Sequence, residues 1–84
     1  MRTYYITFRS VTFAQRGEGL LSAAGLRCSI GRTPRWMEEQ GCGYALKVRT
    51  KDIREAVELL REQKVPLRRV YEGKDGGKME EVTL

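Results

Sequence analysis

Two cysteines are the most reactive side chains of this sequence, and one of them stands in an open setting. Cys42 lies between Gly41 and Gly43, so its neighbours leave the sulfur accessible and let backbone N–H groups approach it. Arg32 and Arg35 come shortly before it, and cations near a thiol favour the nucleophilic thiolate. The sequence predicts a reactive thiol at Cys42, with a cysteine merely tolerated in a tight turn as the alternative.

The second cysteine has a different environment. Cys28 alternates in phase with Leu26 and Ile30, a pattern that predicts a small hydrophobic residue facing a core. The chain has two cysteines and no histidine, which excludes both the imidazole base of the usual catalytic triads and a four-thiolate zinc site within one chain. We therefore expect no metal and no cofactor, and a chain poorly equipped to be a stand-alone hydrolytic or redox enzyme.

The length and the compartment limit the chemistry further. A chain of 84 residues forms one small domain, in which roughly 60 to 65% of the unfolded surface is buried, too little for a core and an enclosed cofactor cavity. The N-terminus has no apolar signal region, and no segment approaches the ~20 apolar residues that cross a bilayer. We expect a cytoplasmic protein without membrane contact, in which both thiols stay reduced.

The charge is unevenly distributed along the chain. Residues 1–36 hold six arginines and one acid, Glu18, for a net charge of +5, whereas residues 37–84 hold ten bases and ten acids. A basic surface on one side implies an anionic partner, which could be nucleic acid, an acidic protein face or a small anion. The alternative is that the charge only keeps a small domain soluble.

Hydrophobic periodicity predicts the elements that position these groups. Strands are expected near residues 3–9, 26–32, 44–50 and 67–71. One helix is expected from a capping box at Thr12 and Gln15 to a stop at Gly25, and another begins near Ile53 and is bounded by Pro66. Residues 73–84 lack an apolar period and are predicted to be a mobile tail, with an extra edge contact through Val82 and Leu84 as the alternative.

This order of elements predicts an α+β fold. A βαββαβ order gives the ferredoxin-like sandwich over residues 1–72, a four-stranded antiparallel sheet with two helices on one face. In the predicted hairpin of the second and third strands, opposite residues have numbers that sum to about 75, which places Cys28 opposite Lys47 and Cys42 opposite Thr33. The two thiols are then about 16 Å apart, too far for a disulfide.

Three segments resemble a known family. Phe8-Arg9-Ser10, Thr33-Pro34-Arg35 and Cys42-Gly43-Tyr44-Ala45-Leu46 are similar to the corresponding segments of the Putative Se/S carrier protein-like family, over about residues 3–72. The resemblance implies that Cys42 is a carrier thiol that takes sulfur or selenium as a persulfide or selenosulfide. It also implies that Thr33, Pro34 and Arg35 shape the adjacent loop, and that the donor is a protein such as a cysteine desulfurase.

Residues near Cys42 have expected roles as well. Arg35 and the N–H groups of Gly43 and Tyr44 are expected to stabilise the anionic sulfur. The acceptor protein is not identified, and Trp36 suits either a docking aromatic or a cover over the core.

Two functions of other classes compete with the carrier. One is a small regulatory or protein-interaction domain of the ACT-like type, which could form a homodimer through its sheet. The other is an RNA-binding module, which the sequence disfavours because the third strand offers Ala45 and Lys47 where stacking aromatics are needed.

Overall fold

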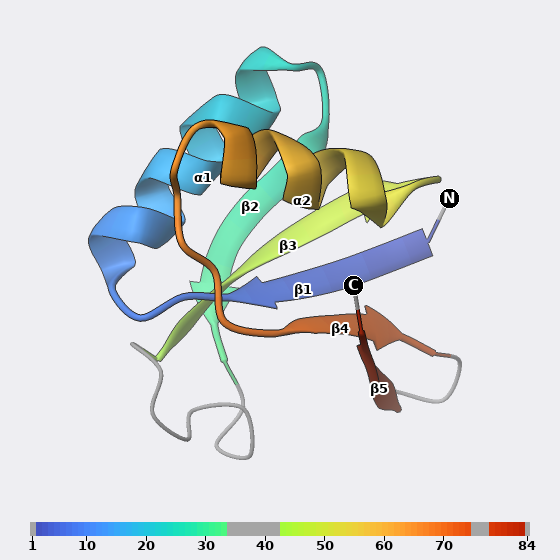
Figure 1. Cartoon of the computed structure of the whole chain (residues 1–84). Coiled ribbons are helices and arrows are strands. Elements are labelled where there is room, and N and C mark those ends of the chain that lie inside the picture. Colours follow the sequence, from blue (N-terminus) through green and yellow to red (C-terminus); the bar gives the residue numbers. More distant parts are fainter. Residues whose placement is uncertain (1, 34–42, 75–77, 84) are drawn as a thin grey trace.

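The structure is a computed structural model that describes residues 2–33, 43–74 and 78–83. Its elements are β1 (Arg2–Thr7), α1 (Val11–Ala23), β2 (Arg27–Arg32), β3 (Tyr44–Thr50), α2 (Ile53–Glu62), β4 (Val70–Gly73) and β5 (Met79–Val82). All strand pairs are antiparallel, in the order β2-β3-β1-β4-β5, and both helices cover one face of the sheet (Figure 1). The predicted α+β class and the βαββαβ order are confirmed.

The predicted number of four strands is wrong, because the sheet has five. β5 lies in the segment predicted to be a tail and pairs with β4, with Val70 opposite Val82 and Gly73 opposite Met79. Val82 pairs with Val70 and packs against the core, which confirms its part of the alternative edge contact, whereas Leu84 lies outside the described residues. The fourth strand also begins later than predicted, at Val70, although Arg68 already donates its backbone N–H to Thr7 O at 2.8 Å.

The core lies between the helices and the central strands. Alternate residues of β1 and β3 face it, as the alternation predicts, and amphipathic stripes of the two helices cover them. The largest side chains that are less than 2% exposed are Phe8, Ile6, Leu21, Leu46, Leu60, Val48, Val57 and Val65.

α1 begins earlier than the sequence indicates. The predicted capping box at Thr12 is wrong, because Ser10 is the N-cap and its Oγ accepts a hydrogen bond from Phe13 N–H at 3.3 Å. Ser10 has extended backbone dihedrals, as an N-cap requires, whereas Thr12 is already inside the helix. The predicted stop is confirmed, since Gly25 has φ +86°, a conformation that favours glycine.

The two glycines inside α1 have opposite environments. A Cβ on Gly17 would lie 3.2 Å from Phe8 Cζ and 3.4 Å from Leu60 Cδ2, so the helix approaches its neighbours closely at this position. A Cβ on Gly19 would meet nothing within 4 Å. A side chain at Gly17 would therefore crowd its neighbours, and one at Gly19 would not.

The register of β2 and β3 differs from the prediction by one residue. The numbers of opposite residues sum to 76, so Cys28 lies opposite Val48 and not opposite Lys47. Directly opposite residues of an antiparallel pair lie on the same face of the sheet. Cys28 and Val48 both face the helices, whereas the predicted register would have paired an inward residue with an outward one.

The free edge of β2 is occupied by an acid from α1. Glu18 Oε2 accepts a hydrogen bond from Ile30 N–H at 3.1 Å. Glu18 is the one acid among residues 1–36, and this contact places it at the outer edge of the sheet. Because Ile30 N–H points away from β3, its donor is satisfied by a side chain in place of a neighbouring strand.

Candidate functional site

The candidate site is the end of the sheet where the chain leaves β2 and enters β3. Thr33 N–H donates a hydrogen bond to Gly43 O at 3.0 Å, which joins the two sides of the loop at its base (Figure 1). Gly43 has φ +81°, in the left-handed region that favours glycine. This glycine lets the chain turn into β3 directly after the bonded pair.

The side chain of Thr33 is unusual at this position. Thr33 is only 7% exposed, and its Oγ1 is buried without a hydrogen-bond partner in the structure as described. A buried hydroxyl without a partner is costly, and most such groups find one. The base of the loop therefore carries a hydroxyl that can donate to, or accept from, a group placed next to it.

A cation is fixed beside this base by an aromatic ring. Arg32 and Tyr44 are directly opposite in the β2–β3 pair, and the guanidinium carbon lies 5.8 Å from the centre of the Tyr44 ring. This is the distance of a cation–π interaction. The sequence places Arg32 near the loop, but its aromatic partner follows only from the register of β2 and β3.

The structure describes some of the predicted site residues and not others. Thr33, Gly43 and Tyr44 lie together at the base of the loop. Thr7 pairs with Ala45, so the end of β1 that leads into Phe8-Arg9-Ser10 reaches the same end of the sheet. Pro34, Arg35, Cys42 and Trp36 lie outside the described residues, and their roles stay predictions.

Cys28 occupies a structural position. It is half-buried and packs against the core, as predicted. Its Sγ lies 3.3 Å from Ser22 Oγ and 3.5 Å from Glu18 O, so the thiol exchanges hydrogen bonds with α1. These contacts hold β2 against the helix.

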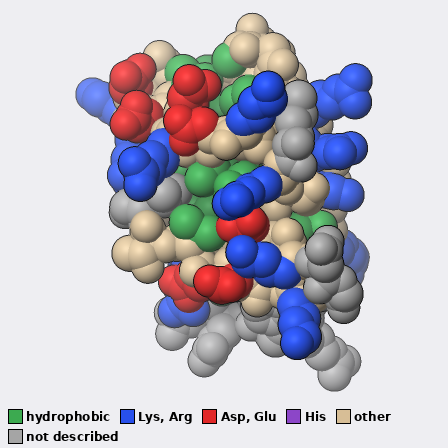
Figure 2. All heavy atoms as spheres, turned by 90° about the vertical axis from the view of Figure 1, so that its right-hand side faces the viewer, with side chains coloured by type: hydrophobic (Ala, Val, Ile, Leu, Met, Phe, Trp, Pro, Cys, Tyr) green, Lys and Arg blue, Asp and Glu red, His purple; other side chains and the backbone are tan. Residues whose placement is uncertain are grey.

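The face of the sheet away from the helices is strongly basic. Arg27 and Arg49 are directly opposite each other, and Lys47 lies two residues from Arg49 on β3, opposite Ser29. Together with Cys28 they line a shallow hollow of about 210 Å³. In Figure 2, Lys and Arg side chains project along the right-hand edge, on the side away from the helix layer of Figure 1.

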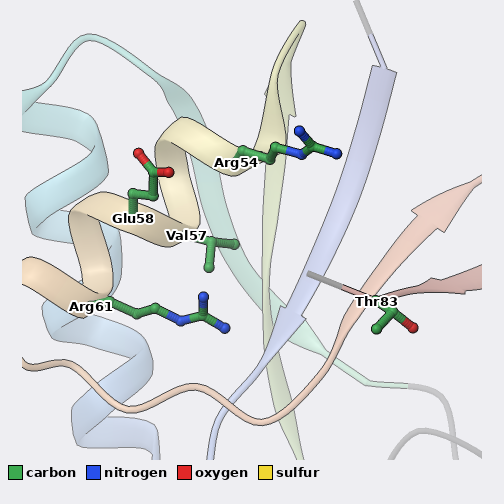
Figure 3. A pocket seen from close by; sticks show the side chains of 5 residues that line it. All are labelled: Arg54, Val57, Glu58, Arg61 and Thr83. Atoms are coloured by element: carbon green, nitrogen blue, oxygen red, sulfur yellow. The ribbon is translucent and has the colours of Figure 1, made fainter.

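A second hollow, of about 230 Å³, lies between α2 and the end of β5. Figure 3 shows Arg54 and Arg61 extending from α2 on either side of Val57, with Thr83 across the gap and Glu58 directed away from both guanidinium groups. Val57 forms an apolar wall between the two cations. Because Glu58 of the same helix also lines this hollow, the hollow carries charges of both signs.

No group of three His, Cys, Asp or Glu side chains suited to hold a metal ion occurs among residues 2–33, 43–74 and 78–83. Within the same ranges, no helix has the length and apolar character needed to span a membrane.

Comparison with known proteins gives a family match that covers the candidate site. No curated protein and no solved structure matches the chain. Residues 3–72 match the family described as Putative Se/S carrier protein-like, a span that runs from β1 into β4 and includes the entire β2–β3 loop. The loop base described above lies within the matched span, whereas β5 lies beyond it. Because the match covers most of the sequence, the chain belongs to this family.

Proposed function

We propose that this protein relays sulfur or selenium on Cys42 as a persulfide or a selenosulfide. The observation that carries the proposal is the family match over residues 3–72, which includes Cys42, the cysteine that the sequence predicts to be reactive. The base of the loop supports it. Thr33 offers a buried hydroxyl without a described partner, and Arg32 offers a cation held on Tyr44.

The chemistry requires one thiolate and two transfers. The Cys42 thiolate attacks the terminal sulfur of a donor persulfide; a new S–S bond forms, the donor's S–S bond breaks, and the donor leaves as a thiolate. In the second transfer an acceptor nucleophile attacks the same terminal sulfur, and Cys42 leaves as a thiolate. No net oxidant is consumed, because the sulfane sulfur passes from one nucleophile to the next.

A relay of this kind works best when no second thiol is close to Cys42. A second thiol within reach would attack the persulfide and release the sulfur as sulfide. Cys28 is held in the β2–α1 contact, 3.3 Å from Ser22 Oγ. We propose that Thr33 and Arg35 stabilise the anionic terminal sulfur by a hydroxyl donor and a cation.

The test is intact-mass spectrometry after incubation with a cysteine desulfurase and free cysteine. The wild type should gain one or more sulfur atoms in a form that cyanide removes, and Cys42→Ser should gain none. Cys28→Ser is the matched control, because it removes the other thiol and should still be loaded. Loading that survives in Cys42→Ser but disappears in Cys28→Ser would refute the assignment.

A wild type that gains no sulfur, with a Cys42 slow toward iodoacetamide, would contradict the carrier proposal as a whole. The thiol would then be structural, and the regulatory or protein-interaction domain would become the better description. Light scattering would show whether such a domain forms a homodimer.

A further inference from the structure

The basic cluster on the open face of the sheet combines three cations that no described acid neutralises. Arg27, Lys47 and Arg49 are exposed, and no carboxylate of the described residues lies within salt-bridge distance of them. The acids of β4 and β5 that form ion pairs have other partners: Glu72 contacts Arg2 and Lys74, and Glu81 contacts Arg69.

The register makes this arrangement unfavourable for the isolated chain. Arg27 and Arg49 are direct cross-strand partners, and like charges in that position repel each other. Lys47 adds a third positive charge at a diagonal position, roughly 7–8 Å away. Salt screens part of this repulsion, and an anion bound between the three cations would relieve more of it.

The shape of the cluster favours a compact anion. The hollow of about 210 Å³ is lined by the three cations, by Cys28 and by Ser29, whose hydroxyl can donate a further hydrogen bond. Arginine presents a planar fork of N–H donors that matches two oxygens of a phosphate-type anion, and lysine adds a point charge.

We propose that Arg27, Ser29, Lys47 and Arg49 form a binding site for a small polyvalent oxyanion of the phosphate type. An RNA strand fits the face less well, because single strands bind to sheets by stacking on exposed aromatic rings. Among the described residues, the aromatic side chains of the open face are Tyr5, which is half-buried, and Tyr71, which is 6% exposed.

This site is separate from the carrier proposal. Arg27 and Arg49 lie at one end of the β2–β3 pair and Thr33 and Gly43 at the other, six residues or about 20 Å along the strands. Binding of an oxyanion at this site therefore does not depend on sulfur transfer at Cys42.

The test is thermal unfolding with sodium pyrophosphate, compared with sodium chloride at equal ionic strength. At about 100 times the dissociation constant, pyrophosphate should raise the Tm of the wild type by roughly 10 °C or more, because a ligand that binds only the folded state stabilises it. Arg49→Gln should raise the Tm without ligand by about 1–4 °C, since it removes the direct repulsion with Arg27.

The same variant should lose most of the pyrophosphate shift, and its dissociation constant by calorimetry should rise at least about tenfold. Arg54→Gln removes the same charge from the helix side and should keep the full shift. Lys47→Gln is a second variant, which should also weaken binding and has no direct like-charge partner to relieve.

Three results would overturn the proposal. Sodium chloride could stabilise the wild type as much as pyrophosphate does, which would show general screening. Arg49→Gln and Lys47→Gln could both keep the pyrophosphate shift, which would place any site elsewhere. A twelve-nucleotide RNA could bind while pyrophosphate does not, which would assign the face to nucleic acid.

Discussion

Replacing Gly17 and Gly19 one at a time by alanine tests how α1 packs on its neighbours. Both glycines are inside the same helix, two residues apart, so the intrinsic gain in helix propensity is about 1 kcal/mol for each. The two positions differ in what the added methyl group meets. At Gly19 there is nothing within 4 Å, whereas at Gly17 the ring of Phe8 would lie 3.2 Å away.

The structure predicts opposite outcomes. Gly19→Ala should increase the free energy of unfolding by about 1 kcal/mol, or raise the Tm by about 4–8 °C for a domain of this size. Gly17→Ala receives the same gain in helix propensity. Its added methyl group crowds the fully buried ring of Phe8, however, and an overpacked core costs about 1–3 kcal/mol. Its net effect should be between zero and a loss of about 2 kcal/mol.

Urea denaturation of the wild type and both variants, followed by circular dichroism, measures the difference directly. The midpoints should separate with unchanged slopes, because the surface exposed on unfolding stays the same. Equal stabilisation by both substitutions would refute the close approach of α1 to Phe8. A loss at Gly19 would refute the open environment assigned to that position.

Three further substitutions, with Gly31→Ala as a control, test the base of the loop and the edge of the sheet. Gly43→Ala should cost about 1–2 kcal/mol in urea denaturation, because φ is +81° there, whereas Gly31→Ala, with nothing within 4 Å of its added Cβ, should not. Thr33→Val should raise the free energy of unfolding by about 1 kcal/mol, since it removes a buried hydroxyl without a partner; a clear loss would show that the hydroxyl is bonded. Glu18→Ala should speed hydrogen exchange of the Ile30 amide and cost about 1 kcal/mol, and unchanged exchange would argue against the hydrogen bond.

Helices and strands whose residue pattern lies within their own segment were predictable from the sequence. Alternation of Tyr4, Ile6 and Phe8 with outward residues fixed the inner face of β1, and the stop at Gly25 follows from its ability to adopt a positive φ. β5 was missed because four residues, of which only Met79 and Val82 are apolar, give no measurable period. Its strand forms through pairing with β4, which a local pattern does not contain.

The candidate site was predictable in its residue types more than in its contacts. The glycines around Cys42 and the cluster of Thr33, Pro34 and Arg35 are visible in the sequence and in the family resemblance. The stacking of Arg32 on Tyr44 depends on a cross-strand register, and an error of one residue in that register moves every partner to the other face.

The hydrogen bond from Ile30 to Glu18 also limits how this protein can associate with itself. An exposed strand edge is a template on which a second chain can extend the sheet, and aggregation often starts there. At β2 a carboxylate already occupies one of the outward amides and adds a negative charge. Two copies meeting edge to edge at β2 would bring two such carboxylates together, so this edge resists polymerisation into a continuous sheet.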